Sequence, residues 1–195
     1  MKVWIGFAAG VIAGALVVPP LLHHLHAAMK GTVPMTSANA SALAHTRESF
    51  SFTANGPMSE VAPLFGAERE KEWARGWEPR FVWPTPAVDR EGMVFTVAHG
   101  DRTAVWVNTR FDLEKGDVQY VYVIPEVMTT RITLKISRDG ERTRVKVDYE
   151  RTALSAGAAR LVREMAEHDA TAGEEWRTEI DAAHAKRSAG SARRS

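Results

Sequence analysis

The run Glu70-Lys-Glu-Trp-Ala-Arg-Gly-Trp-Glu-Pro-Arg-Phe-Val-Trp-Pro84 contains three of the chain's six tryptophans, Trp73, Trp77 and Trp83, within eleven residues. Along this run a helical pattern changes to an extended one, so the rings lie at a helix-to-strand junction. Tryptophan rings bury a large area and need a core or a pocket to receive them. The run therefore predicts a concave surface beside this junction.

Short extended segments dominate the chain on both sides of this run. Phe50 and Phe52 alternate with polar residues, and Asn55-Gly56-Pro57 ends this first strand. Two short segments of helix-like composition follow it, at residues 59–65 and 68–74. Further strands linked by short turns bring the predicted total to seven: residues 80–83, 93–98, 103–112, 118–124, 130–137 and 142–151.

Turn residues predict how these strands pair. Asp139-Gly140 is a favoured two-residue turn, which places Leu134 opposite Val145 and Ile132 opposite Val147. Apolar side chains then share one face of the sheet and charged side chains the other. By the same argument a turn at Lys115-Gly116 puts two sets on the inner face, namely Val107, Thr109 and Phe111 beside Tyr120, Tyr122 and Ile124.

The end of the chain predicts one long helix, from Ser155 as its N-cap to about Lys186. Apolar residues recur there at three- and four-residue steps and form a stripe that can cover the apolar face of the sheet. Asp169 and Gly173 interrupt the stripe near its middle, and a gap there would be a cavity. The stripe consists of Ala158, Leu161, Val162, Met165, Ala172, Trp176, Ile180 and Ala183.

Four pieces, in this order, resemble the SRPBCC superfamily of START-like and polyketide cyclase-like proteins: Glu70-x-x-Trp73-x-x-Gly76-Trp77-x-Pro79, Gly92-Met-Val-Phe95, Thr103-x-Val105-Trp106-Val107 and Tyr149-x-x-Thr152-Ala-Leu-Ser155. The resemblance implies an α+β helix-grip fold. In that fold a seven-stranded curved antiparallel sheet wraps on a long C-terminal helix, with two short helices after the first strand. It also implies a hydrophobic cavity, used by different members for lipid, sterol or polyketide binding and sometimes for catalysis.

The sequence outside this domain predicts a membrane segment. Residues 3–22 carry no charge and have the length of a bilayer-spanning helix, although Pro19-Pro20 interrupts it. The predicted organisation is an N-terminal hydrophobic helix at 1–30, acting as an anchor or a signal segment, a linker at 31–46, the helix-grip domain at 47–187 and a disordered basic tail at 188–195. The domain is expected to be membrane-associated on the extracytoplasmic side. If translation starts at Met29 or Met35, it is instead cytoplasmic.

Composition excludes several classes of function. Lysine plus arginine (25) nearly balance aspartate plus glutamate (24), so no broad positive field favours nucleic acid. Cysteine is absent, which removes disulfides, thiolate metal sites and cysteine catalysis. His23, His24 and His26 have no nearby carboxylate or fourth ligand and are interpreted as a polar flank. No cofactor and no metal site are predicted.

The candidate ligand-binding residues are seven aromatic side chains expected to line the cavity, with tyrosine hydroxyls as orienting polar groups. They are Trp73, Trp77, Phe95, Trp106, Tyr120, Tyr122 and Tyr149. No catalytic residue is assigned. Glu70 is interpreted as a surface or helix-end carboxylate, His99 as a turn residue, and Glu164, Glu167 and His168 as part of a solvated helix face that also includes Asp169.

These observations predict binding of a hydrophobic, lipid-like small molecule by a membrane-tethered domain. Two alternatives remain open. One is an enzyme of the polyketide cyclase or hydrolase kind, with Glu70 or Tyr120 as acid or base. The other is a non-catalytic cell-envelope interaction module, whose basic tail from Lys186 to Ser195 contacts anionic lipid or a partner.

Overall fold

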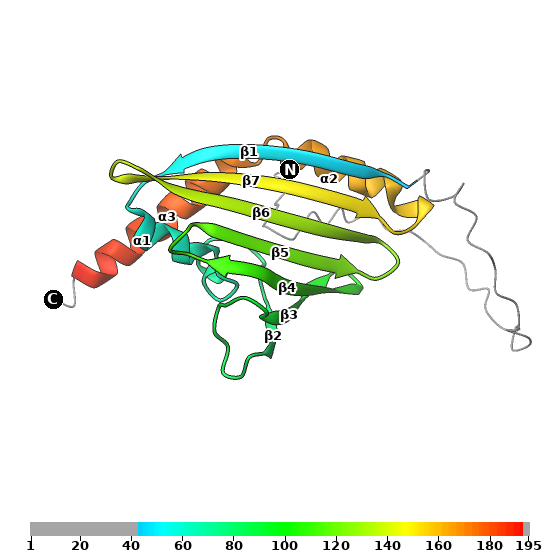
Figure 1. The fold of residues 1–195 in the computed structure, drawn as a ribbon, viewed down its shortest axis with the longest axis horizontal. Helices are drawn as coiled ribbons and strands as arrows, with labels where there is room; N and C mark the ends of the chain where they lie inside the picture. The colour runs from blue at the N-terminus through cyan, green and yellow to red at the C-terminus, as the bar shows by residue number, and fades with distance from the viewer. Residues whose placement is uncertain (1–42, 193–195) are drawn as a thin grey trace, which may run out of the picture.

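The structure, a computed structural model, describes residues 43–192. Its centre is one antiparallel sheet with the strand order β1-β7-β6-β5-β4-β3-β2 (Figure 1). Successive hairpins join β2 to β7, in line with the short turns predicted between these strands, and β1 pairs with β7. The strands are β1 (His45–Ala54), β2 (Arg80–Trp83), β3 (Val94–His99), β4 (Arg102–Asp112), β5 (Asp117–Ile124), β6 (Met128–Asp139) and β7 (Arg142–Ala153).

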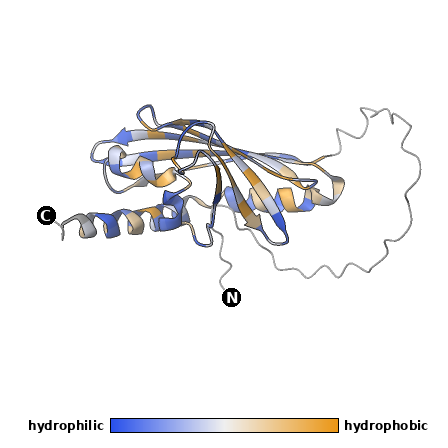
Figure 2. Cartoon of the chain, turned by 90° about the horizontal axis from the view of Figure 1, so that it is seen from below, coloured by the Kyte–Doolittle hydropathy of each residue, from blue (hydrophilic) through white to orange (hydrophobic). Residues whose placement is uncertain are grey.

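Helical segments follow the first and the last strand. After β1 come single turns, which confirm the two short helical segments: α1 (Met58–Val61), η2 (Ala62–Phe65) and η3 (Arg69–Glu72). After β7 come η4 (Ala156–Ala158), α2 (Ala159–Asp169) and α3 (Gly173–Ala192). Both α2 and α3 pack against β1, at one side of the sheet, and apolar and polar residues alternate along the strands (Figure 2).

The β6–β7 hairpin has a different register from the predicted one. Leu134 pairs with Val147 and Ile132 with Tyr149, so each partner is shifted by two residues. The reason is that Gly140, with φ of 64°, is the first central residue of the turn and not the second. Because strand side chains alternate with a period of two, the shift leaves the apolar face unchanged.

The predicted inner face of β4 was wrong. Trp106 pairs with Tyr122 and is buried, as is Asn108, whereas Thr109 is exposed. The pairing shifts register between Asn108 and Arg110, so the alternation changes phase there. Phe111 therefore returns to the inner side, partly buried, although Val107 and Thr109 do not lie with the tyrosines.

The predicted single C-terminal helix is divided in two. α2 ends at Asp169, and the backbone closes tightly through hydrogen bonds from Thr171 N–H to the His168 carbonyl and from Ala172 N–H to that of Asp169. At Gly173 the chain runs so close to β1 that an added Cβ would lie 3.2 Å from the Phe50 ring. The break lets α3 settle against β1.

Residues 1–42 and 193–195 lie outside the described part, and with them the predicted hydrophobic helix, His23, His24 and His26, and most of the linker. Within residues 43–192, no helix combines the length and the apolar character needed to cross a bilayer. β1 begins at His45, and α3 continues to Ala192 where the sequence predicted an unstructured tail from residue 188.

We predict that Gly116→Ala destabilises the fold more than Gly100→Ala. Both glycines have a positive φ in a hairpin turn, 69° and 61°, but a Cβ at Gly116 would lie 1.8 Å from the Ile136 carbonyl oxygen and one at Gly100 meets nothing. Strain alone costs about 1 kcal/mol or slightly more, and displacing the β6 backbone adds about 2 kcal/mol. Chemical denaturation of both variants measures this difference, and equal losses would contradict it.

Candidate ligand-binding site

The inner face of the sheet carries a row of side chains that crosses five strands. Strand register aligns Phe95 with Trp106, Trp106 with Tyr122, Tyr122 with Thr130, and Thr130 with Arg151. Trp106 stacks on Tyr122 with ring centroids 4.2 Å apart and on Phe95 at 5.7 Å. This first row is therefore aromatic toward β3 and polar toward β7.

A second row lies beside the first, one pair of residues further along each strand. Register aligns Tyr149 with Ile132, Ile132 with Tyr120, and Tyr120 with Asn108. All four side chains are buried, and the Trp106 ring meets Tyr120 edge-on at 6.4 Å. The two rows together place five of the predicted ligand-binding residues on one continuous surface.

Trp77 covers the aromatic end of the first row. Its ring centroid lies 5.2 Å from that of Trp106 and 5.8 Å from that of Phe95, edge-on in both cases. Its indole N–H donates to the Ala67 carbonyl at 2.7 Å. Trp77 lies beyond the end of η3, in the segment that leads to β2.

Trp73 belongs to a different aromatic cluster, which holds α3 in place. Its ring lies 5.3 Å from Trp176 and 6.1 Å from Phe65, and its indole N–H donates to the Leu64 carbonyl at 2.7 Å. Trp176 in turn packs edge-on against Phe50 of β1 at 5.1 Å. Trp73 thus joins η2 to α3.

A buried ion pair closes the polar end of the first row. Arg151 donates to both carboxylate oxygens of Asp169, at 2.7 and 2.8 Å, and to the Tyr122 hydroxyl and Thr130 Oγ1, at 2.6 and 3.1 Å. The guanidinium also lies 4.6 Å from the Tyr149 ring centroid. The interpretation of Asp169 as part of a solvated face was therefore wrong.

Sequence reasoning missed Arg151, although the chain contains a signal for it. Val145, Val147 and Tyr149 alternate on the inner face, and Arg151 is the next residue in that alternation. A charge that continues an apolar row needs a partner inside the protein.

His99 is more than a turn residue, because it ends β3 and its ring lies over Tyr122 at 6.4 Å. Its Nε2 is buried and has no hydrogen-bond partner among the described residues. Burial, and then the positive charge of Arg151, lower the pKa of His99. The imidazole is thus held in its neutral form, which can accept as well as donate.

Glu70 is buried, which corrects its interpretation as a surface carboxylate. Its side chain belongs to a residue only 1% exposed, and neither carboxyl oxygen has a hydrogen-bond partner in the described part of the chain. Burial, and then the charge of Asp89, raise the pKa of Glu70 well above its ordinary value. A carboxyl group in such a place is neutral until it gains a partner.

Asp89 fixes the turn that carries Glu70. Its carboxylate accepts hydrogen bonds from the backbone N–H groups of Glu68 and Ala67, which open that turn. The carboxylate lies against Gly66, where an added Cβ would be 2.1 Å from Oδ2. Asp89 thus caps the turn from a distant part of the sequence, while its Oδ1 is buried without a partner.

Tyr120 and Asn108 lie in the second row beneath this turn. The Tyr120 hydroxyl donates to the Phe65 carbonyl, and burial, followed by the charges of Glu70 and Asp89, raises the pKa of Tyr120. The Asn108 amide contacts Met93 Sδ at 3.8 Å through Nδ2, but its Oδ1 has no partner among residues 43–192. The atoms without a partner around Tyr120, among the described residues, are therefore the two carboxyl oxygens of Glu70, one of which carries a proton while the group is neutral, and the amide oxygen of Asn108, which only accepts.

The glutamate and histidine side chains that the sequence excludes as a metal site lie on α2. Glu164 pairs with Arg160 at 2.5 Å, and His168 approaches Glu175 at 3.8 Å. Within the described residues, no three histidine, aspartate or glutamate side chains are grouped so that they could hold a metal ion.

The fold has relatives among solved structures. Norcoclaurine synthase from Thalictrum flavum superposes with a TM-score of 0.56 at 8% identity, over 81% of this chain and 96% of that one. The chain shares the helix-grip fold of these structures. Two further matches to this helix-grip domain have TM-scores of 0.52. One is Ara h 8.0201, at 9% identity over 73% of this chain and 99% of that one. The other is an uncharacterized protein from Rhizobium leguminosarum, at 11% identity over 74% of this chain and 97% of that one.

Sequence comparison adds nothing to this structural likeness. No family model matches the sequence, and no curated protein matches it. At these low identities the structural matches support the fold, while any function has to come from the site itself.

We predict that Glu70 makes a contribution to stability that is lost as pH rises above about 4.5, the ordinary pKa of a glutamate, and that Glu70→Gln removes this contribution. Because the folded-state pKa of Glu70 is raised, the folded chain binds more protons than the unfolded chain between the two pKa values. Stability is lost across that window. Thermal unfolding from pH 4.5 to 8 measures it, with the exposed Glu78→Gln as a matched control; identical pH profiles for the two variants would refute the assignment.

Proposed function

We propose that the domain binds a hydrophobic small molecule whose polar end donates hydrogen bonds. The observation that carries this proposal is the environment of Glu70, whose two carboxyl oxygens are buried and have no hydrogen-bond partner among residues 43–192. Buried polar groups in folded proteins nearly always have a hydrogen-bond partner, and an unpaired one costs free energy. A bound molecule with a hydroxyl or amine group supplies the missing donors.

The surroundings of Glu70 decide which kind of molecule fits. The Trp106 ring meets Tyr120 of the second row, Trp77 packs against Trp106, and Asn108 Oδ1 beside Tyr120 has no hydrogen-bond partner in the described part of the chain. A ligand held here has an aromatic or aliphatic body and a polar end directed toward Tyr120. A ligand with a carboxylate at that end could accept one hydrogen bond from the neutral Glu70 carboxyl, but it would also face the second Glu70 oxygen and Asn108 Oδ1 as acceptors and is disfavoured relative to a donor.

Structures with the same fold support small-molecule binding by analogy. Norcoclaurine synthase from Thalictrum flavum was solved in complex with dopamine and hydroxybenzaldehyde, at a TM-score of 0.54 and 9% identity to this chain. Both are small aromatic molecules with polar substituents. This likeness favours the class of ligand and says nothing of its identity.

An enzyme is the second candidate, and the position of Glu70 favours it specifically. A buried carboxyl with a raised pKa can act as a general acid at neutral pH. The Tyr120 hydroxyl is close enough that the charge of Glu70 raises its pKa. A substrate polarised by Glu70 would then be held against Trp106 and Tyr120 during reaction.

Membrane tethering is part of the proposal and rests on residues 3–22 of the sequence. Fractionation of cells that produce the chain with a C-terminal tag is expected to recover it with membranes, and N-terminal sequencing to show that residues 3–22 are retained. The domain is expected on the extracytoplasmic side, accessible to protease added to cells with a permeabilised outer layer. Recovery without membranes, with a start at Met29 or Met35, would overturn this part.

For the ligand, we predict that 1-naphthylmethylamine raises the Tm of the full chain more than 1-naphthoic acid does. The two have similar aromatic bodies, but only the amine donates hydrogen bonds at its polar end. A ligand at 100 times its Kd stabilises by about 2.7 kcal/mol, which moves Tm by several degrees. Differential scanning calorimetry measures both shifts.

Variants separate the outcomes of this experiment. Glu70→Gln replaces an acceptor by a donating amide and is expected to reduce the preference for the amine, whereas Glu78→Gln, which is exposed, keeps it. Turnover of a bound molecule that Glu70→Gln abolishes while binding persists identifies the enzyme. Equal shifts with amine and acid in every variant argue against the proposed polarity of the site.

A further inference from the structure

The connection between β2 and β3 presents an apolar surface to solvent. Residues 82–88, Val-Trp-Pro-Thr-Pro-Ala-Val, contain no charge and only one polar side chain. Val82 is 58% exposed, Trp83 47% and Val88 54%, three of the five large hydrophobic side chains that the described chain exposes. We call residues 82–88 the apolar tip.

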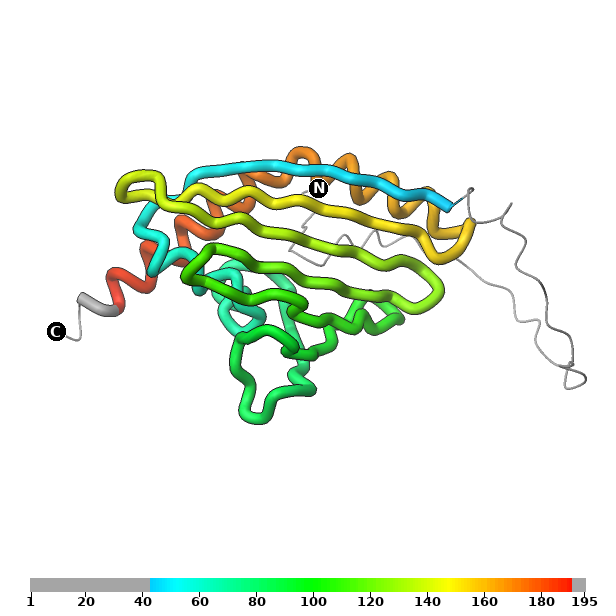
Figure 3. Tube along the Cα trace, viewed as in Figure 1, coloured from blue at the N-terminus to red at the C-terminus, as the bar shows by residue number. Residues whose placement is uncertain are grey.

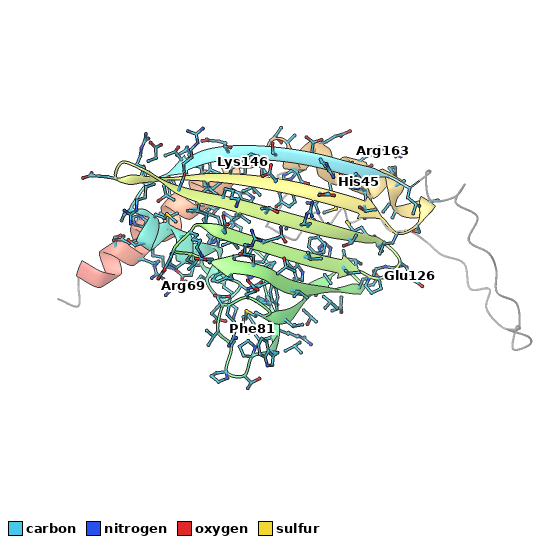
Figure 4. The ribbon with its side chains drawn as sticks, viewed as in Figure 1. His45, Arg69, Phe81, Glu126, Lys146 and Arg163 are labelled. Atoms are coloured by element: carbon cyan, nitrogen blue, oxygen red, sulfur yellow. The ribbon has the colours of Figure 1, made fainter. Side chains whose placement is uncertain are left out.

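The apolar tip projects from the edge of the sheet that is opposite β1. The tube drawing shows the connection extending beyond β2 and β3, away from α2 and the other strands (Figure 3). Phe81, the last residue before the tip, lies at its base with the side chains of the connection beyond it (Figure 4). A projecting tip of this kind can touch a flat surface before the rest of the domain does.

Two arginines border the apolar tip. Going outward from it, the first exposed charged residue is Arg80 on one side and Arg90 on the other, and no described carboxylate forms an ion pair with either. The Arg90 guanidinium lies 5.1 Å from the Trp83 ring centroid. The nearest exposed glutamates, Glu78 and Glu91, lie further along the sequence from the tip than the two arginines do. The intervening Asp89 is turned toward the amides of Glu68 and Ala67.

The backbone of the apolar tip also favours contact with lipid over contact with another protein strand. Pro84 and Pro86 have no N–H, so fewer donors stay unpaired when the tip leaves water. The same lack makes the tip a poor partner for strand addition. β2 itself has four residues, with a register shift between Phe81 and Trp83.

We propose that the apolar tip inserts into the interfacial region of an anionic phospholipid bilayer, with Arg80 and Arg90 at the level of the phosphates. Tryptophan with short apolar neighbours is favoured at that depth, and arginines next to it are attracted by the negative surface. A group of exposed apolar side chains with arginines at its border fits a membrane surface. This contact is separate from the ligand site and does not depend on it.

The chain has no cysteine, so a single introduced cysteine can carry an environment-sensitive dye. The full chain with Val88→Cys, labelled with a nitrobenzoxadiazole dye, is mixed with vesicles of phosphatidylcholine and phosphatidylserine. The emission is expected to move to shorter wavelength and to be quenched by spin-labelled lipid. Leu154→Cys, at another exposed apolar position, is the matched control and is expected to stay in water even if residues 3–22 are inserted.

Further variants test the two components of the surface. With the dye at position 88, Trp83→Ser and Val82→Ser together are expected to lower the inserted fraction at least about tenfold, because each large apolar side chain contributes a comparable factor. Arg80→Glu with Arg90→Glu is expected to remove the dependence on phosphatidylserine. Arg138→Glu with Arg142→Glu makes the same charge change on the β6–β7 hairpin and is expected to leave the dependence on phosphatidylserine unchanged.

Three results would overturn the proposal. The first is a dye at position 88 that stays exposed to water when vesicles have bound the chain. Dyes at 88 and 154 shifting equally would show nonspecific contact. Shielding at 88 that needs no vesicles and grows with protein concentration would show that a second copy of the chain covers the apolar tip.

Discussion

The ion pair between Arg151 and Asp169 joins the sheet to the C-terminal helices at the residue where α2 ends. Both side chains are almost fully buried, at 3% and 7% exposure, so each charge depends on the other. Removing one partner of such a pair leaves an uncompensated charge and costs about 3 to 5 kcal/mol. The pair thereby fixes where α2 stops and where the chain turns.

The position of α3 follows from that fixed point. The turn after Asp169 brings Gly173 against Phe50, and one helical turn later Trp176 meets both Phe50 and Trp73. Trp73 then holds η2 through its hydrogen bond to the Leu64 carbonyl. The short helical segments that lie over Tyr120 are thus positioned by contacts that lead back to the ion pair.

One connection of the chain links the interior to the surface. Asp89 follows the apolar tip directly, and its carboxylate caps the turn that carries Glu70. The apolar tip and the turn that carries Glu70 are therefore joined through one residue, Asp89. The physical link consists of the hydrogen bonds to the amides of Glu68 and Ala67 and the tight contact at Gly66.

The sequence by itself determined the seven strands, the short helical segments after β1 and the aromatic character of the inner face, because alternation and turn residues are local properties of the chain. It also placed Phe95, Trp106, Tyr120 and Tyr122 among the candidate residues, and the structure brings these together. Tertiary structure decided the rest. Trp106 and Phe111 both face inward because β4 shifts register between them. Glu70 is buried within the folded core, and Asp169 is buried against Arg151, which is remote in sequence. Burial of a charge depends on groups that only the folded chain brings near, so no local pattern could reveal it.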